Sequence, residues 1–409
     1  MLLTIRPNKI KRLIISHITI LSVLLFIYSG YVKVFIVAYP QIFPSTIDIT
    51  AFSLVLALFF SIITNDSRIS IRKTPLPLVI FTVLLILIII SLYYSHSKVY
   101  AILKTRNIFT NIFALALPML TPTILSSKLF FKYLIFFGSV LGLLYVTTIK
   151  PFIWAIDHFY PLRTNYLTCG LFSSISILVL YYKKKVFKNL ILISLLTFVN
   201  LIVLVISGAR APLIFLLLMI STIFVFKSHP VIVTVINRKK FRYIFLLLIL
   251  TVFLFFIAIK NNRFGPDIEK HIGYSIERLS LLTQADKGGS INERTNYSSF
   301  VFNNFTNSIL IGHGVGSFPV LYEGKDQRGY PHNVFLELLF EYGIIGVFIF
   351  IAFLFSCFRH RNGDKTILII SVFIFLNTLK SYGFEDLRFF VFFIGLYYMS
   401  SRINLKNGM

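Results

Sequence analysis

The sequence predicts an all-α fold, a polytopic membrane helix bundle of about 12 transmembrane helices with one long, partly helical loop. Three observations support this prediction: the composition, a series of apolar runs, and one long polar connection. The chain is 57% hydrophobic and only 13% charged, with a mean hydropathy of +0.84. A water-soluble core cannot absorb that much apolar surface, because a large share of any globule stays in contact with water.

Apolar runs of roughly 14 to 24 residues recur along the chain, and most are long enough to cross ~30 Å of hydrocarbon. Residues 30–46 are apolar but contain Gly30, Pro40 and Pro44, which favours an interfacial segment. The basic N-terminus before the first run resembles a signal sequence, but without a small-residue cleavage site we expect an uncleaved span. The predicted spans are 13–29, 47–63, 76–94, 107–125, 129–149, 166–182, 189–206, 212–226, 243–259, 333–357, 366–379 and 389–401.

The net charge of +25 is explained by topology rather than by nucleic-acid binding. With a cytoplasmic N-terminus, 23 of the 40 Lys and Arg residues fall in cytoplasmic segments or, for Lys132, just inside the adjoining span; Asp66 and Asp364 alone oppose them there. The basic clusters 183–185, 238–240 and 359–361 all lie on that side, as the positive-inside rule requires. We therefore expect both termini to be cytoplasmic and the basic residues to face anionic lipid.

Three regions follow from this topology: N-terminal helices in 1–259, a long periplasmic loop in 260–332, and C-terminal helices in 333–409. Loops of that length are usually functional. Within it, Asp267–Gln284 has the apolar spacing of an amphipathic helix, and Ser290 with Glu293 forms a capping box for a helix to about Asn307. The glycines of 311–318 follow no predicted strand, so we expect a turn packed on the membrane surface rather than a dinucleotide site.

His332 lies where the long loop enters the apolar run 333–357, at a point that the topology places on the periplasmic face. Asn333 can cap the helix, and Glu337 and Glu341 then share one helix face, roughly 7 and 13 Å below His332. A carboxylate in hydrocarbon costs several kcal/mol unless it is paired or faces a wet cavity. Both acids should therefore face the bundle interior and need a partner, whereas a lone histidine is also explained as a cap or an interfacial anchor.

Two arginines fall on the same predicted face as His332. Arg210 lies in the short connection Ser207–Pro212, and Arg294 lies near the start of the helix that the capping box opens. Guanidinium groups bind phosphate oxygens in a two-pronged geometry and stay charged, so the pair suits a diphosphate. A headgroup anchor for Arg210 and a solvated helix charge for Arg294 are the simpler alternatives.

Neither a metal site nor a disulfide framework is indicated. Cys169 and Cys357 lie far apart inside apolar runs, which is typical of buried free thiols. The loop acids lack the clustering that a divalent cation needs, although 267–269 brings two of them close together. These acids are Asp267, Glu269, Asp286, Glu323 and Asp326.

Taken together, these segments resemble the bacterial O-antigen ligase and O-antigen polymerase family. The resemblance spans about residues 200–360, and the N-terminal half agrees only as a hydrophobic profile. It is carried by four pieces of sequence in a fixed order. These are Ser207-Gly208-Ala209-Arg210, Glu293-Arg294, the glycine-containing 311–318, and His332-Asn333 followed by an apolar helix with Glu341, Gly343 and Gly346. The family often has an aromatic residue, commonly Trp, shortly after the loop arginine, where this chain has Asn296-Tyr297.

The resemblance implies a glycosyltransferase of the inner membrane that needs no metal and no cofactor, and that inverts the anomeric centre. Its donor would be a glycan on undecaprenyl diphosphate. His332 would be the base for the acceptor hydroxyl, and Arg210 and Arg294 would hold the diphosphate. Glu341, Glu337 and Asn333 would support the helix. The expected partners are the lipid-linked donor, a glycan acceptor and membrane lipid, with a flippase and a chain-length regulator of the same pathway.

Such a family contains two activities. A polymerase passes the growing glycan to the next lipid-linked repeat unit, and a ligase passes finished glycan to the lipid A core. The loop Tyr330–Asn333 favours the polymerase, with the ligase as the alternative. A flippase or other transporter of lipid-linked oligosaccharide is a third hypothesis, which the absence of an evident internal repeat disfavours.

Overall fold

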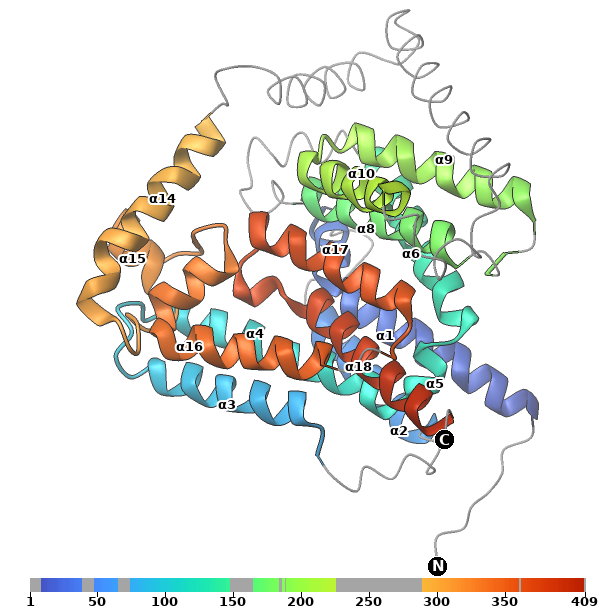
Figure 1. Ribbon diagram of the computed structural model, residues 1–409, viewed down its shortest axis with the longest axis horizontal. Helices are drawn as coiled ribbons and strands as arrows, with labels where there is room; N and C mark the ends of the chain where they lie inside the picture. The colour runs from blue at the N-terminus through green and yellow to red at the C-terminus, as the bar shows by residue number, and fades with distance from the viewer. Residues whose placement is uncertain are drawn as a thin grey trace, which may run out of the picture. The chain divides into compact units, whose positions relative to one another are not determined.

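The computed structural model describes residues 9–38, 48–64, 74–147, 165–183, 186–187, 189–225, 289–359 and 362–407, and within these ranges all regular structure is helical (Figure 1). Each predicted span other than 243–259 falls on a helix. That span and the expected helix at Asp267–Gln284 lie outside the described residues. The capping-box helix is found as α14, Gly289–Phe305, continued by the 3-10 turn η2, Thr306–Ser308.

The other helices follow the apolar runs closely. By length and composition, Leu13–Lys33 and Val334–Phe358 are the described segments that meet the criterion for crossing a membrane. The helices are α1 (Lys9–Ala38), α2 (Ile49–Thr64), α3 (Leu76–Ser91), α4 (Tyr100–Leu120), α5 (Pro122–Leu125), α6 (Lys128–Thr147), α8 (Asn165–Tyr182), α9 (Leu190–Ile206), α10 (Arg210–Val225), α15 (Ser317–Glu323), α16 (Val334–Phe358), α17 (Lys365–Ser381), η3 (Phe384–Asp386) and α18 (Arg388–Asn407).

The chain forms two compact units. Unit 1 comprises Met1–Ser29, Asp48–Ser127 and Lys287–Met409, and unit 2 comprises Gly30–Ile47 and Lys128–Asp286. In unit 2, α8 packs against α6, α9 and α10 through small residues. Gly138 leaves no room for a Cβ against Ser176, and the Asn200 amide donates to the Ser139 hydroxyl at 2.7 Å. Small residues and interhelical hydrogen bonds are how helices associate in lipid.

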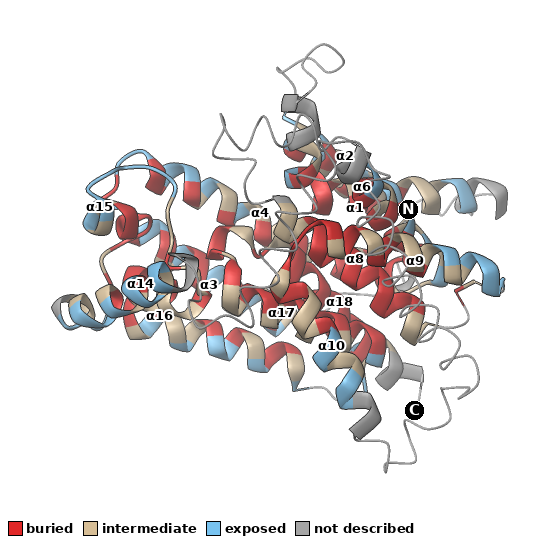
Figure 2. Cartoon of the chain, turned by 90° about the horizontal axis from the view of Figure 1, so that it is seen from above, coloured by how far each residue is buried: buried red, intermediate tan, exposed pale blue. Residues whose placement is uncertain are grey.

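In unit 1, α4 packs along α18, and α3 packs along α16. Rings of Phe81 and Phe353 meet at 5.1 Å between the latter pair. Arg388 joins three helices, because its guanidinium donates to Thr110 of α4 and to the Phe26 carbonyl and Ser29 hydroxyl of α1. Figure 2 shows the buried faces of these helices in red.

The helix α16 is broken at Gly343, where φ is 63° and ψ is −164°. A segment of the preceding loop satisfies the backbone groups that the break frees. The amides of Ile344 and Ile345 donate to the carbonyls of Ile309 and Leu310 at 2.9 and 3.2 Å. Non-helical backbone at membrane depth is tolerated only where protein satisfies it in this way.

At the break the chain turns back on itself. A Cβ on Gly346 would lie 3.6 Å from the carbonyl oxygen of Leu338, eight residues earlier. A straight helix would separate residues that far apart by about 12 Å. The prediction of one continuous span over 333–357 is therefore corrected, because Gly343 divides it into a short helical arm, Val334–Tyr342, and a longer one, Ile344–Phe358.

Candidate functional site

His332 precedes the short arm of α16 in a left-handed backbone conformation, with φ of 55°. Among the described residues it is the single non-glycine with positive φ. Asn333 next to it caps the helix as expected, since its side-chain oxygen accepts from the amides of Phe335 and Leu336 at 2.9 and 3.2 Å. A left-handed conformation costs roughly 1–2 kcal/mol for a residue with a Cβ, and such strain gathers at functional sites. Asn333 thus caps the helix, and the His332 imidazole does not serve as the cap.

Two tyrosines enclose the His332 ring. Tyr297 of α14 stacks on it at 5.9 Å between centroids and 26° between planes, and Tyr330 meets it edge-on at 4.7 Å. Tyr297 is anchored in a cluster of buried residues with Val301, Phe318 and Phe340. The aromatic that follows the loop arginine in this chain is therefore a wall of the histidine site.

The surroundings hold His332 in its neutral form. Burial, and then the positive charge of Arg294, lower the pKa of His332 to about 4 against the opposing effect of Glu293. Its Nδ1 atom is buried and has no hydrogen-bond partner. The backbone of Ser381, at the end of α17, interacts with the ring and favours its protonated form. A neutral imidazole with one nitrogen unused can accept a proton from a bound group.

Arg328 clamps the loop before His332 onto the turn between α17 and α18. Its Nε donates to Glu385 at 2.7 Å, and its terminal nitrogen donates to both oxygens of Asp386 at 2.9 Å. Glu385 also accepts from the Tyr100 hydroxyl and the Asn107 amide. Since Ser381 is the last residue of α17, directly before this turn, the clamp holds both the chain that carries His332 and the backbone beside its ring.

Glu337 and Glu341 share one buried cation, Lys104 of α4. The Lys104 Nζ lies 2.5 Å from Glu337 and 2.6 Å from Glu341, and all three side chains are fully buried. The second oxygen of Glu337 accepts from the amide of Phe384 at 2.8 Å. The partner that these acids were expected to need is thus present, and it is Lys104.

The predicted boundary of α4 explains why Lys104 was not foreseen. The apolar run begins at about residue 107, which leaves Lys104 in a polar connection. The helix starts earlier because Asp326 accepts from the Lys98, Val99 and Tyr100 amides at 2.8 to 3.0 Å. Although desolvation opposes them, these bonds and one from the Ser97 hydroxyl lower the pKa of Asp326 to about 2. A cap from a residue 226 positions later leaves no local signal.

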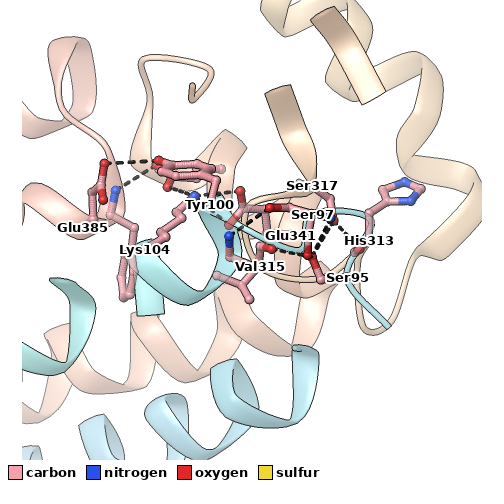
Figure 3. A network of polar contacts seen from close by, with 12 residues as sticks. Ser95, Ser97, Tyr100, Lys104, His313, Val315, Ser317, Glu341 and Glu385 are labelled. Carbon is pink, nitrogen blue, oxygen red and sulfur yellow. Dashed lines mark hydrogen bonds and ion pairs between the residues drawn. The ribbon is translucent and has the colours of Figure 1, made fainter. Parts of the chain in front are cut away.

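The glycines of 311–318 form a turn that packs on protein (Figure 3). Gly312 lies against the backbone of Glu341, and Gly314 lies against that of Ser95, each with positive φ and no room for a Cβ. The amides of His313 and Gly314 donate to the carbonyls of Phe340 and Glu341 at 2.9 Å. The turn therefore locks the end of the short arm to the connection between α3 and α4.

The structure brings five of the predicted site residues together in unit 1. His332 and Asn333 begin the short arm, Glu337 follows on it, and Arg294 lies close enough to influence the charge of His332. Glu337 and Glu341 both lie on the short arm, before the break at Gly343. Arg210 is the first residue of α10 and belongs to unit 2, where it is half-buried.

Among the described residues, no group of three His, Cys, Asp or Glu side chains is placed to hold a metal ion. The described thiols, Cys169 and Cys357, are both buried and free. The chemistry that the unit 1 site offers consists of one neutral imidazole, one nearby guanidinium and aromatic walls.

These features define a class: a helical membrane protein with a histidine site at one end of a broken helix. Residues 193–351 match the family model described as O-antigen ligase, and this match supports the O-antigen ligase and polymerase family. The match covers most of α9, all of α10, α14, η2 and α15, and most of α16, and it includes Arg210, Arg294 and His332. Members of this family are glycosyltransferase-like enzymes integral to the bacterial inner membrane, and they use lipid-linked glycans. A search of curated proteins found no match to the chain.

Proposed function

We propose that this protein is an O-antigen or surface polysaccharide polymerase. It transfers a glycan from undecaprenyl diphosphate to the next lipid-linked repeat unit on the periplasmic face of the inner membrane, and both of its termini are cytoplasmic. The observation that carries the proposal is the neutral His332 ring beside Arg294, with a buried nitrogen that has no hydrogen-bond partner.

The reaction is a single displacement without a metal. His332 removes the proton from the acceptor hydroxyl as the hydroxyl oxygen attacks the anomeric carbon of the donor glycan. The bond from that carbon to the diphosphate oxygen breaks with inversion, and the undecaprenyl diphosphate leaves with the bonding electrons. Arg294 and Arg210 are assigned to stabilise the negative charge that develops on the leaving oxygen.

The low pKa of His332 suits an enzyme that binds an anion. In the empty site the imidazole with a pKa of about 4 is a weak base, because burial and Arg294 disfavour its protonated form. A diphosphate bound at Arg294 brings negative charge that offsets the arginine, so donor binding raises the pKa of His332. The base then becomes stronger when the substrate is in place.

The carboxylates act on position rather than on substrate. Glu337 and Glu341 are fully buried against Lys104, so neither is available to a sugar hydroxyl. Through the Phe384 amide, Glu337 holds the turn that also carries Ser381 and the Arg328 partners. We assign these acids to holding the short arm of α16 against α4.

The ligase is the second candidate, because the matching family model is described as O-antigen ligase. Deleting the gene and separating the lipopolysaccharide on a gel distinguishes the two activities. A polymerase deletion leaves the core carrying one repeat unit. A ligase deletion leaves bare core while lipid-linked polymer accumulates, and that result would replace the polymerase by the ligase.

A transporter of lipid-linked oligosaccharide is tested separately. Buried ionisable groups within membrane helices, such as Lys104, also mark transport pathways. Radiolabelled lipid-linked repeat units incubated with the reconstituted protein would become longer glycans if it is a polymerase. Labelled units that change their side of the bilayer but not their length would contradict the enzyme.

A further inference from the structure

Four exposed apolar side chains lie outside the two candidate membrane helices, Leu13–Lys33 and Val334–Phe358. Three of them are next to the break in α16. Phe302 is 59% exposed, Ile309 41%, Leu310 64% and Ile311 45%. We call these four residues the apolar lip. They follow the polar part of α14, and three of them are consecutive. Consecutive exposed apolar side chains of this kind mark an interaction site rather than a water-facing loop.

Backbone hydrogen bonds hold the apolar lip beside the start of the long arm of α16. Ile309 and Leu310 accept from the first two amides of the long arm, at Ile344 and Ile345. From that point the long arm carries exposed apolar residues at the spacing of one helix face (Figure 2). These residues are Ile345, Phe348, Ile351 and Phe355. The lip therefore continues the exposed apolar face of α16 beyond its start.

Another hydrogen bond holds the apolar lip beside the end of α3. The Tyr94 hydroxyl donates to the carbonyl of Ile311 at 2.8 Å. The exposed face of α3, which includes Ile86, Ile89 and Ile90, ends just before Tyr93, whose side chain is 99% exposed. Tyrosines are enriched at the boundary between hydrocarbon and headgroups. Two neighbouring helices thus place the lip where their lipid-facing surfaces end.

We propose that the apolar lip inserts into the lipid leaflet on the side of His332, with its side chains among the upper acyl-chain carbons. The partner is the bilayer, because the lip continues two helix faces whose exposed residues are suited to lipid. The lip also leads directly into the 312–317 turn that locks the short arm, so its contact with lipid sets the height of the His332 site relative to the leaflet. Membrane insertion does not depend on which glycan is transferred.

Single cysteines carrying spin labels test the proposal in the full-length protein. Cys169 and Cys357 are replaced by alanine, and the protein is reconstituted into phosphatidylethanolamine–phosphatidylglycerol vesicles. Labels at Leu310→Cys and Ile311→Cys are compared with Phe348→Cys on the long arm and Asn296→Cys, an exposed polar position on α14. Collision with oxygen reports hydrocarbon, and collision with a water-soluble nickel chelate reports water.

The labels on the lip should resemble Phe348→Cys, with severalfold more collision with oxygen relative to nickel than Asn296→Cys shows. A nickel accessibility equal to that of Asn296→Cys would place the lip in water and overturn the proposal. Labels at both lip positions that neither reagent reaches would show that protein covers the lip, and that result would overturn it as well. Monodisperse elution of each variant confirms folding before the comparison.

Discussion

His332 is held neutral by two influences of different kinds, burial and the charge of Arg294. Burial disfavours any positive charge in the site. The effect of Arg294 comes from its own charge, so substituting Arg294 removes that effect alone. The single left-handed non-glycine among the described residues is thus also the residue whose protonation depends on a neighbour from another helix.

Replacing Arg294 should shift the pH dependence of transfer. A base must be unprotonated in the free enzyme, so kcat/KM falls as pH drops through the pKa of His332. Arg294→Gln removes a charge that lowers this pKa, so the acidic limb should move to higher pH. Glu293→Gln is the matched control, because Glu293 raises the same pKa and its loss should move the limb to lower pH. If the acidic limb of the kcat/KM profile lies at the same pH in the wild type and in both variants, His332 is excluded as the titrating base.

Removing the buried cation Lys104 should destabilise the protein strongly. Lys104→Met leaves two carboxylates buried without their partner, and breaking a buried ion pair typically costs about 3–5 kcal/mol. The midpoint of thermal unfolding in detergent should fall by several degrees or more. Lys98→Met, at an exposed position near the start of α4, should leave the midpoint unchanged. Combining Lys104→Met with Glu337→Gln and Glu341→Gln should recover part of the loss, and no recovery would argue against the pairing.

At the scale of elements, the break in α16 is the feature that shapes the site. It depends on Gly343, whose positive φ suits glycine and whose Cα lies against the backbone of Leu310. The break lets one apolar segment supply both the short arm with its acids and a longer arm for the membrane.

The Gly343→Ala substitution should therefore lower the stability of the protein by more than the backbone strain alone would. An alanine there is left-handed, and its Cβ would overlap the Leu310 backbone, so we expect a loss of stability beyond the roughly 1–2 kcal/mol of the strain. Gly324→Ala provides the comparison, since Gly324 has φ of 70° but nothing within 4 Å of the added Cβ. Unfolding midpoints of the two variants measure the difference. Equal losses would mean that the contact with Leu310 is unimportant.

Apolar periodicity predicted the helices well, because a membrane span needs a length of hydrocarbon-compatible residues that is visible locally. The capping box at Ser290 and the cap at Asn333 are also local signals, and both helices begin near them. The break at Gly343 and the early start of α4 depend on contacts with residues distant in sequence, at 309–310 and at Asp326. Lys104 was missed for that reason, whereas Tyr297 was noted as an aromatic beside Arg294 without its place against His332 being visible.

At the scale of the whole molecule, the proposed reaction draws on residues that are far apart in the sequence. His332 and Arg294 belong to unit 1, and Arg210 belongs to unit 2 at the start of α10.

Arg210→Lys tests whether Arg210 binds the diphosphate. Lysine keeps the charge but cannot reproduce the two-pronged geometry of guanidinium on a phosphate oxygen pair, so glycan transfer should fall by tenfold or more. The chain-length profile of the lipopolysaccharide and the initial rate in vesicles both report the loss. Full activity with lysine would make Arg210 an anchor for headgroups.

The most direct test of the central claim is the glycan profile of a deletion strain that carries only a His332 variant. His332→Ala removes the imidazole, and His332→Asn does so with a residue that tolerates the left-handed backbone. Both proteins should insert in the membrane at normal levels, and both should leave the lipopolysaccharide of the deletion strain unextended. Normal banding with either variant would contradict the role of His332 as the base.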